Sequence, residues 1–376
     1  MVHQHCVKGL AKVCLWRPLR TVLWVVALLL LSGASRAEQL VDLYRYKTLV
    51  ASRDQKELNR AINDGFAEVL VRAAGQAQVL QDPNVVRELR RARSLVVQYV
   101  YESTSETIAP GDGPPVPATR LVITYSAQEI DKLLRNLQLP FWPPNRPNML
   151  VWIVVDEGAS GRRFANEQSF KEVVDAVRIH TERRGIPLSW PLLDLEDQVA
   201  LSADSAWRLD EGKIKAASER YHPDSILVGR LKQSGSGEWQ SDWQLLHKDR
   251  DQVMDSRASE VNNVVATVMD RVADYFFSQY GIVRGAAPAE VISLAISGID
   301  RFEQYMAALK YLEGMAIVRR ADLIAVNGNR MQVQVYTEGD MKLFQDALAL
   351  EKKLVPDTAV VSPGIDNFSS LAYVWR

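Results

Sequence analysis

Two pairs of acidic residues have side chains and positions suited to chemistry at the edge of a sheet. Asp156 and Glu157 directly follow the apolar run 150–155, which predicts a strand covered on both faces. Asp194 and Glu196 follow the end of another predicted strand. Open α/β sheets bind ligands at the carboxyl ends of their strands, so these carboxylates are candidates for catalysis or for holding a divalent cation. The alternative, which we favour, is that they are solvated loop acids.

The sequence carries no motif for a nucleophile, a nucleotide or a catalytic metal. The segment Gly158–Gly161 lacks the spacing of a nucleophile elbow. Gly235–Gly237 lies between two predicted antiparallel strands, where a turn is the ordinary interpretation. Beyond residue 37 the histidines are His180, His222 and His247, and no two of them have a short metal-ligand spacing. We therefore predict no metal ion and no cofactor.

Two further groups of residues are candidates for binding. Arg87, Arg90 and Arg91 lie in a helix predicted to begin at Asp82-Pro83, and spacings of three and four place them on one face. A solvated face is the ordinary interpretation, and a docking site for an anionic lipid, glycan or protein is the alternative. Trp239 and Trp243 are four residues apart on a predicted strand, so they share a face. Packing in the interior is favoured there over a carbohydrate-stacking platform.

Residues 1–37 have the pattern of a secretory signal peptide. Ser35-Arg36-Ala37 supplies small residues where signal peptidase cleaves, and the apolar run Val22–Leu31 is far shorter than the roughly 20 residues that span a bilayer. We predict cleavage after Ala37 and export to the periplasm. An uncleaved inner-membrane anchor is the alternative, because the basic region ahead of the apolar run is long. Its basic residues are Lys8, Lys12, Arg17 and Arg20.

Composition after residue 37 limits the classes of function. Both cysteines lie within residues 1–37, so a processed chain has no disulfide, no thiol nucleophile and no zinc–thiolate site. Processing leaves 339 residues, which suggests two or three domains, and removes five basic residues and no acidic ones. The formal net charge therefore moves from −1 to −6. A mildly acidic chain of this kind argues against a nucleic-acid partner and limits membrane contact to the periphery.

Hydrophobic periodicity divides the chain into three small domains of α/β and α+β class with mixed sheets. The middle domain is predicted to be a three-layer α/β sandwich, because buried parallel strands precede an antiparallel meander and a long helix. The last domain has a β-α-β-β-α order, which predicts a ferredoxin-like unit. The predicted divisions are an α+β domain at 38–139, a proline-rich linker at 140–148, the α/β domain at 149–281, the β-α-β-β-α domain at 288–357 and a tail at 358–376.

Several local signals specify individual elements. An apolar stripe predicts a helix from Asp54 to Gly75. Asn327-Gly328 predicts a hairpin turn. Phe141-Trp142 lies among the linker prolines, and we expect this pair to pack at a seam between domains rather than to bind a ligand. In the tail, Leu371, Tyr373 and Trp375 alternate with other residues and predict one further strand for a neighbouring sheet.

Several of these segments together resemble an uncharacterised Gram-negative family known as domain of unknown function 2066. The resemblance covers most of the chain after residue 37 and implies no functional residues, because that family has no assigned activity. The middle domain is also similar to the α/β domain of penicillin-binding-protein activators, of the TolB amino-terminal domain and of curli-secretion lipoproteins. That similarity implies partner binding at the level of the fold. The segments that carry the first resemblance are 67–75, 137–142, 150–156 and 226–231 with Trp239 and Trp243. The second rests on a strand that ends in Val228-Gly229-Arg230, the glycine turn after it, the strand with the two tryptophans and the closing helix.

From these observations we expect a non-catalytic periplasmic envelope protein that binds a protein partner or assists an assembly. Small mixed sheets with exposed edges favour docking by strand addition. One alternative is a hydrolase acting on cell-wall or glycan substrates through Asp156, Glu157, Asp194 and Glu196. Another is a membrane-tethered adaptor that keeps its signal segment. The sequence leaves open the identity of the partner and the oligomeric state.

Overall fold

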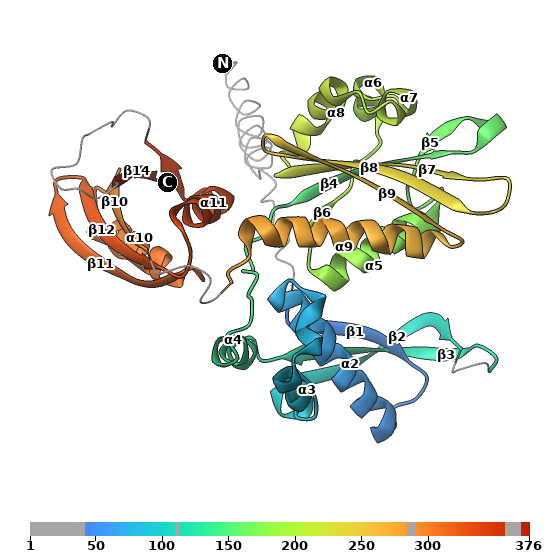
Figure 1. Ribbon diagram of the computed structural model, residues 1–376, viewed down its shortest axis with the longest axis horizontal. Helices are drawn as coiled ribbons and strands as arrows, with labels where there is room; N and C mark the ends of the chain where they lie inside the picture. Colours follow the sequence, from blue (N-terminus) through green and yellow to red (C-terminus); the bar gives the residue numbers. More distant parts are fainter. Residues whose placement is uncertain (1–41, 110–112, 284–289, 358–369) are drawn as a thin grey trace, which may run out of the picture. The chain divides into compact units, whose positions relative to one another are not determined.

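The computed structural model describes residues 42–109, 113–283, 290–357 and 370–376. The predicted signal peptide and the cleavage site after Ala37 lie outside the described residues. The described chain combines helices with three sheets, as expected of an α/β and α+β protein made of several small modules (Figure 1). We call these the first module (42–137), the middle module (149–281) and the last module (290–376). Among the described residues, no helix combines the length and apolar character needed to cross a bilayer.

The first module has a three-stranded antiparallel sheet in the order β1-β3-β2, and its main elements follow the order that the sequence predicts. Buried residues of β3, among them Leu121 and Ile123, share one core with Ile62 and Phe66 of α2. Strand β2 is an edge strand that is largely exposed, although its alternating pattern predicts a half-buried one. The elements are β1 (Arg45–Val50), α2 (Gln55–Ala74), α3 (Pro83–Leu89), β2 (Val96–Ile108), β3 (Val116–Tyr125) and α4 (Ala127–Asn136).

Helix α2 begins and ends where its capping residues predict. The Asp54 side chain accepts a hydrogen bond from the Glu57 backbone N–H at 2.8 Å, which satisfies one of the free donors of the first turn. Gly75 has φ +76°, the left-handed conformation that glycine adopts at least cost after a helix. A Cβ atom at Gly75 would also lie 2.3 Å from the ring of Phe277, so close packing adds a second demand for glycine.

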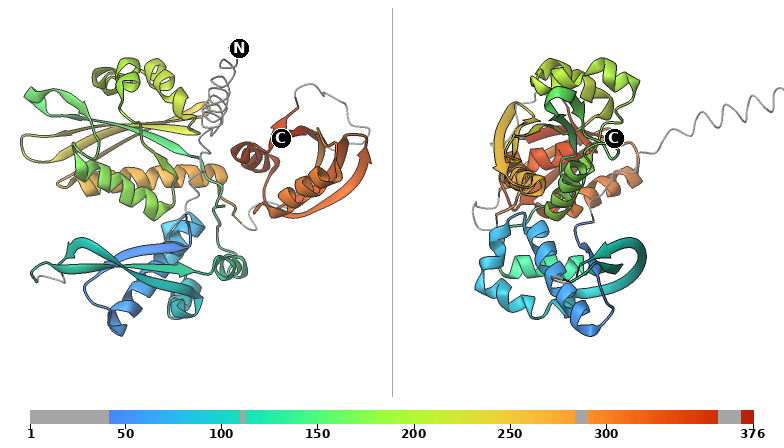
Figure 2. Two further views of the ribbon diagram at one scale, coloured as in Figure 1. Left: turned by 180° about the vertical axis from the view of Figure 1, so that it is seen from behind. Right: turned by 90° about the vertical axis from the view of Figure 1, so that its right-hand side faces the viewer.

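The middle module is a mixed sheet with helices on both faces, which is the predicted three-layer arrangement (Figures 1 and 2). Alternate residues of β4 face opposite sides of this sheet. Val151 and Ile153 pack in the core on the side of α5 and α9. Leu150, Trp152 and Val154 pack in the core on the other side, with residues of α7 and α8 and with Leu201 at the end of α6. The strand order is β5-β4-β7-β8-β9, with β6 paired to β4. The elements are β4 (Met149–Asp156), β5 (Arg162–Phe164), α5 (Lys171–Arg184), β6 (Leu188–Ser189), α6 (Leu195–Ala200), α7 (Ala203–Trp207), α8 (Glu211–Ser218), β7 (Ser225–Gln233), β8 (Trp239–His247), β9 (Arg250–Ala258) and α9 (Val261–Tyr280).

The last module contains the predicted β-α-β-β-α order and then two further strands. Its sheet order is β11-β12-β10-β14-β13, and the antiparallel hairpin predicted at Asn327-Gly328 joins β11 to β12. Strand β14 from the tail lies between β10 and β13, parallel to β10 and antiparallel to β13. The elements are β10 (Val291–Ser297), α10 (Phe302–Gly314), β11 (Val318–Asn327), β12 (Arg330–Thr337), α11 (Met341–Glu351), β13 (Leu354–Pro356) and β14 (Ser370–Trp375).

The linker 140–148 is an ordered segment built around a buried arginine. Phe141 belongs to one apolar core and Trp142 to another, so the predicted packing of this pair at a seam agrees with the structure. The Arg146 guanidinium lies 4.0 Å from the ring centroid of Trp142 and is 5% exposed. Every hydrogen bond that it makes goes to a backbone carbonyl, including those of Arg72 in α2 and Arg184 in α5.

Candidate functional site

The acidic pair at the end of β4, Asp156 and Glu157, is held by two arginines of the neighbouring strand β5. Asp156 accepts a hydrogen bond from Arg162 Nε at 3.2 Å, and Glu157 accepts one from Arg163 Nε at 2.7 Å. A third acid, Asp204 of α7, also contacts Arg162 at 3.0 Å. Each candidate carboxylate is therefore half of an ion pair near the surface, where such pairs contribute little free energy and form no catalytic centre by themselves.

Asp194 and Glu196 lie at a helix start instead of the strand end that the sequence predicts. Asp194 caps α6 by accepting a hydrogen bond from the Asp197 backbone N–H, because carboxylates are stabilised at the positive end of a helix. Arg220 contacts Asp194, Glu196 and Asp197 at 2.9–3.4 Å. The hydrogen bond from Arg220 is the main reason that the pKa of Asp194 lies below its ordinary value.

The two acidic pairs belong to opposite ends of the same sheet. Asp156 is the last residue of β4, whereas Met149 at the other end pairs with Ser225, which follows Arg220 by five residues. No group of three or more potential ligands among the described residues is arranged to hold a metal ion. The geometry thus offers no shared cleft between the pairs, which the hydrolase alternative requires.

The arginine candidates do not form the continuous helical face that their spacing predicts. Helix α3 ends at Leu89, Arg90 is its C-cap and Arg91 precedes a short 3₁₀ turn. The backbone N–H groups of Arg90 and Arg91 donate to carbonyls three residues back, at Arg87 and Glu88, so the helix tightens and ends here. All three arginines are exposed, and Arg91 forms a 3.4 Å ion pair with Glu88. They are individual surface cations.

The tryptophan pair lies on one face of β8, as the spacing predicts, but it is not available to a sugar. Trp243 is fully buried, and Trp239 packs against the same core while half-buried. Gly229 on β7 pairs directly with Trp243, and a Cβ atom there would lie 2.4 Å from the indole ring. The indole of Trp243 therefore occupies the space where any other residue at position 229 would place its side chain.

Of the three histidines, His247 is part of the interior. His247 Nδ1 lies 2.9 Å from the Tyr275 hydroxyl, and Nε2 lies 2.9 Å from the Tyr280 hydroxyl. Burial, with a smaller contribution from the nearby Lys248, lowers the pKa of His247 to about 4. The imidazole is thus neutral at physiological pH and acts as a hydrogen-bonding element of the core.

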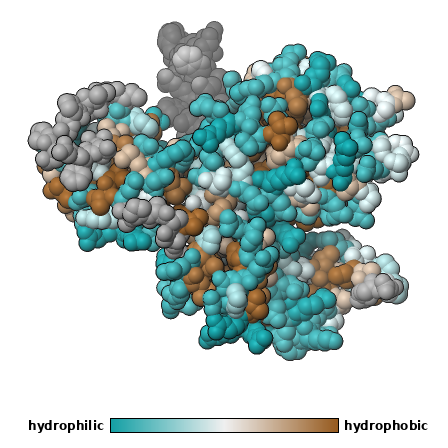
Figure 3. Space-filling view, in the orientation of Figure 1, coloured by the Kyte–Doolittle hydropathy of each residue, from teal (hydrophilic) through white to brown (hydrophobic). Residues whose placement is uncertain are grey.

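The feature that the sequence did not single out is an apolar surface on the last module. Phe302 is 73% exposed, and further exposed apolar side chains belong to α10 and β11. Figure 3 shows apolar residues, in brown, at the surface of the last module. We call this the α10–β11 surface; it comprises Phe302, Tyr305, Met306, Leu323, Ile324 and Val326. A helix that carries apolar residues at this spacing ordinarily turns them toward the core. The spacing Phe302–Met306, four residues apart and beside the buried pair Ala308 and Leu312, was the available signal.

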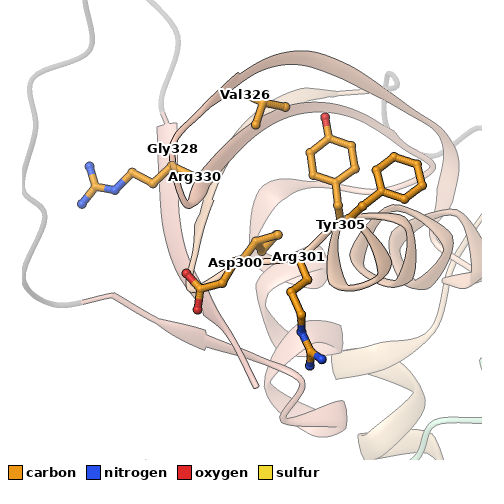
Figure 4. A pocket seen from close by; sticks show the side chains of 8 residues that line it. Asp300, Arg301, Tyr305, Val326, Gly328 and Arg330 are labelled. Atoms are coloured by element: carbon orange, nitrogen blue, oxygen red, sulfur yellow. The ribbon is translucent and has the colours of Figure 1, made fainter.

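A pocket of about 340 Å³ opens within this surface between the start of α10 and the β11–β12 turn. Phe302 and Tyr305 stack with ring centroids 6.3 Å apart and an angle of 15° between the rings. Figure 4 shows the Tyr305 ring near Val326, whereas the side chains of Arg301 and Arg330 extend outward from the pocket rim. The wall is mainly aromatic and aliphatic, and the rim carries two arginines and Asp300. Volumes and linings of this kind suit an apolar group.

The start of α10 explains how the pocket forms. Arg301 is the N-cap, and the Gln304 side chain accepts hydrogen bonds from the backbone N–H groups of Asp300 and Arg301 at 3.0 and 3.2 Å. Asp300, a residue type that often caps helices, lies one position before the N-cap. These two bonds from the backbone to Gln304 fix the start of α10 at Phe302, which lines the pocket.

Comparison with known proteins gives one family match. Residues 37–143 match a family model described as Domain of unknown function (DUF8605), which is a different number from the family that the sequence resembles. The match includes the first module and ends within the linker, so it lies outside the α10–β11 surface. A search of curated proteins finds no match.

Proposed function

We propose that this protein is an exported, non-catalytic envelope protein that binds a protein partner in the periplasm, and that the α10–β11 surface is its docking site. The exposure of Phe302 beside a preformed apolar pocket carries the proposal. Soluble proteins rarely expose clustered apolar side chains, and those that do commonly use them to bind a partner. Phe302 and Tyr305 provide the aromatic contacts that are enriched at the energetic centres of interfaces.

The charges at the pocket rim indicate the chemistry of the partner. Arg301 and Arg330 are exposed, and within the described residues neither forms an ion pair. Asp300 supplies a single opposing carboxylate, so the rim is net positive although the chain after residue 37 is acidic. The surface therefore fits an apolar segment flanked by acidic residues, whose carboxylates face the two guanidinium groups.

Strand addition along the whole of β11 is disfavoured by its irregular backbone. The register with β12 shifts between Val318 and Arg320 and again between Leu323 and Ala325. Irregularities of this type are a common means of protecting an edge strand from pairing. Docking through side chains in the pocket is therefore the mode that we propose, in place of the strand addition that the sequence favours.

The proposal of export rests on the pattern of residues 1–37. The proposal of partner binding agrees with the similarity of the middle module to the TolB amino-terminal type of domain. We also propose a relationship to domain of unknown function 2066. The ion pairs of Asp156 and Asp194 support a non-catalytic role, because each acid is engaged with an arginine at a separate end of the sheet.

A crosslinking experiment in intact cell envelopes tests the docking site. A photoreactive amino acid replaces Met306 in the full-length protein, and a matched probe replaces Val253, an exposed apolar residue of β9 in another module. We expect one specific crosslinked protein from position 306, joined through an apolar segment with acidic flanks, on a chain that begins at Glu38. Crosslinks from 306 no stronger than those from 253 would contradict the proposal.

Charge reversal provides the second control for this experiment. The substitution Arg330→Glu should remove the crosslink at 306, because it places a carboxylate against the acidic flank of the partner. The substitution Arg257→Glu reverses the charge of an exposed arginine on β9 and should leave the crosslink intact. Equal effects of the two substitutions would show that rim charge does not guide binding.

A further inference from the structure

Helix α6 of the middle module has its polar and apolar sides reversed relative to an ordinary surface helix. Its buried residue is the acid Asp197, which is 1% exposed. Leu195 and Val199 are 77% and 81% exposed, and Leu192 in the segment before the helix is also exposed. A surface helix normally turns aliphatic side chains toward the core and its acids toward water. We call Leu192, Leu195 and Val199 the α6 patch.

A polar network holds α6 in this orientation. The buried Asp197 carboxylate accepts hydrogen bonds from the Tyr221 hydroxyl at 2.6 Å and from Arg220 at 3.1 Å. The Leu193 backbone N–H donates a third bond to it, at 2.8 Å. Turning the helix over would break these bonds and leave a buried charge without partners, which is costly. The α6 patch is therefore presented to solvent by a fixed structure.

The charge beside the α6 patch is negative. Asp194, Glu196 and Asp197 all form ion pairs with Arg220, so three carboxylates share one guanidinium. Glu196, the neighbour of Leu195 in the sequence, keeps an exposed side chain within this group. An acidic surface of this kind is repelled by an anionic membrane and attracted to a positively charged rim.

The α6 patch has the chemistry that the α10–β11 surface requires of its partner. The pocket there suits an apolar group, and Arg301 and Arg330 make its rim net positive. The α6 patch is an apolar segment with acidic neighbours, and its exposed side chains can enter a pocket. Leu195 and Phe302 are both exposed in a single copy, so each surface is uncovered there. Contact between two copies would remove both apolar surfaces from water.

We propose that the partner of the α10–β11 surface is a second copy of this chain, whose α6 patch fills the pocket while Glu196 faces Arg330. The proposal rests on the docking site assigned above and names its occupant. The patch and the pocket are different surfaces of the chain. Contacts between them join two copies reciprocally in a dimer, or successive copies in a ring or an open chain.

Crosslinking between two distinguishable copies tests the proposal. One full-length copy carries the photoreactive amino acid at Met306, and a second copy has an epitope tag and no probe. We expect a crosslink between them, which mass spectrometry places within residues 192–200 of the tagged copy. Leu195→Ser in the tagged copy should reduce it at least about tenfold, because burial of a leucine side chain contributes that factor to affinity. The matched control is Val253→Ser, a change at another exposed aliphatic residue of the middle module, which should leave the crosslink unchanged.

A charge swap between the copies separates direct pairing from loss of folding. Arg330→Glu in the copy with the probe should weaken the crosslink about tenfold, because it places like charges together. Glu196→Arg in the tagged copy should have the same effect for the same reason. The two substitutions together, one in each copy, should restore the crosslink, which two misfolded variants could not do.

The outcomes separate this proposal from the docking site itself. Crosslinks from position 306 to a different protein would retain the docking site and exclude a second copy as its partner. A join made only within the copy that carries the probe would also overturn the proposal. A crosslink between copies that is unaffected by Leu195→Ser and by the charge changes would rule out the α6 patch. Crosslinks from 306 no stronger than those from a probe at 253 would contradict the docking site as well.

Discussion

Replacing Arg146 with methionine should destabilise the protein more than replacement of any exposed arginine. Arg146 donates to five carbonyl oxygens, at distances of 2.7–3.1 Å. Two of these oxygens belong to Arg72 and Arg184, near the ends of α2 and α5, where the helix dipoles are negative. The guanidinium is thus neutralised by dipoles of two helices, and burial still lowers its pKa.

The magnitude follows from what methionine leaves behind. Methionine fills part of the arginine volume but donates no hydrogen bond, so five buried carbonyls lose a partner. A hydrogen bond to a charged group contributes about 1.5–3 kcal/mol when it is removed alone. Five such bonds to one group are not additive, because the group can move toward new partners, and each buried carbonyl left without a partner costs about 1–3 kcal/mol. We expect a loss of about 4 kcal/mol in the free energy of unfolding.

Urea unfolding followed by tryptophan fluorescence measures this loss, and thermal unfolding gives an independent value. A loss of 4 kcal/mol corresponds to a Tm lower by roughly 8–16 °C. The matched control is Arg163→Met, since Arg163 also lies over an aromatic ring, that of Phe170 at 5.1 Å, but is 55% exposed. The control should cost less than about 1 kcal/mol. Equal losses for the two variants would refute the assignment of Arg146 as a buried structural donor.

Three further outcomes are expected. The pKa of His247 in the folded chain is about 4, below its ordinary 6.5. As the pH falls, the unfolded chain therefore takes up a proton on this histidine before the folded chain does. The free energy of unfolding should decrease by about 3 kcal/mol between pH 6.5 and pH 4. Urea titrations of His247→Gln should lack that component. Gly229→Ala should lower Tm by several degrees because its Cβ meets the Trp243 ring, whereas Gly235→Ala, with open space around it, should not. Asp54→Ala should cost about 1 kcal/mol in urea unfolding, through loss of the α2 cap.

Local sequence patterns were sufficient for elements whose limits depend on nearby residues. Asp54 and Gly75 bracket α2 because capping involves contacts within a few residues and a glycine conformation that other residues rarely adopt. The hairpin at Asn327-Gly328 and the buried strand β4 follow from equally local rules of turn chemistry and apolar run length. The same rules do not find α6 and α7, which are short, and α6 carries the exposed apolar residues Leu195 and Val199.

Positions that depend on distant partners were decided by the tertiary structure. The sequence shows that Phe302 and Met306 are apolar and helical, but their exposure depends on where β11 and β12 end beside α10. It shows a strand pattern in the tail, but the pairing of β14 with β10 joins residues more than 70 positions apart. Arg146 is an ordinary linker residue in the sequence, and its role arises because carbonyls from separate segments converge on it. Burial and hydrogen bonding of this kind are properties of the packed chain, and no local spacing encodes them.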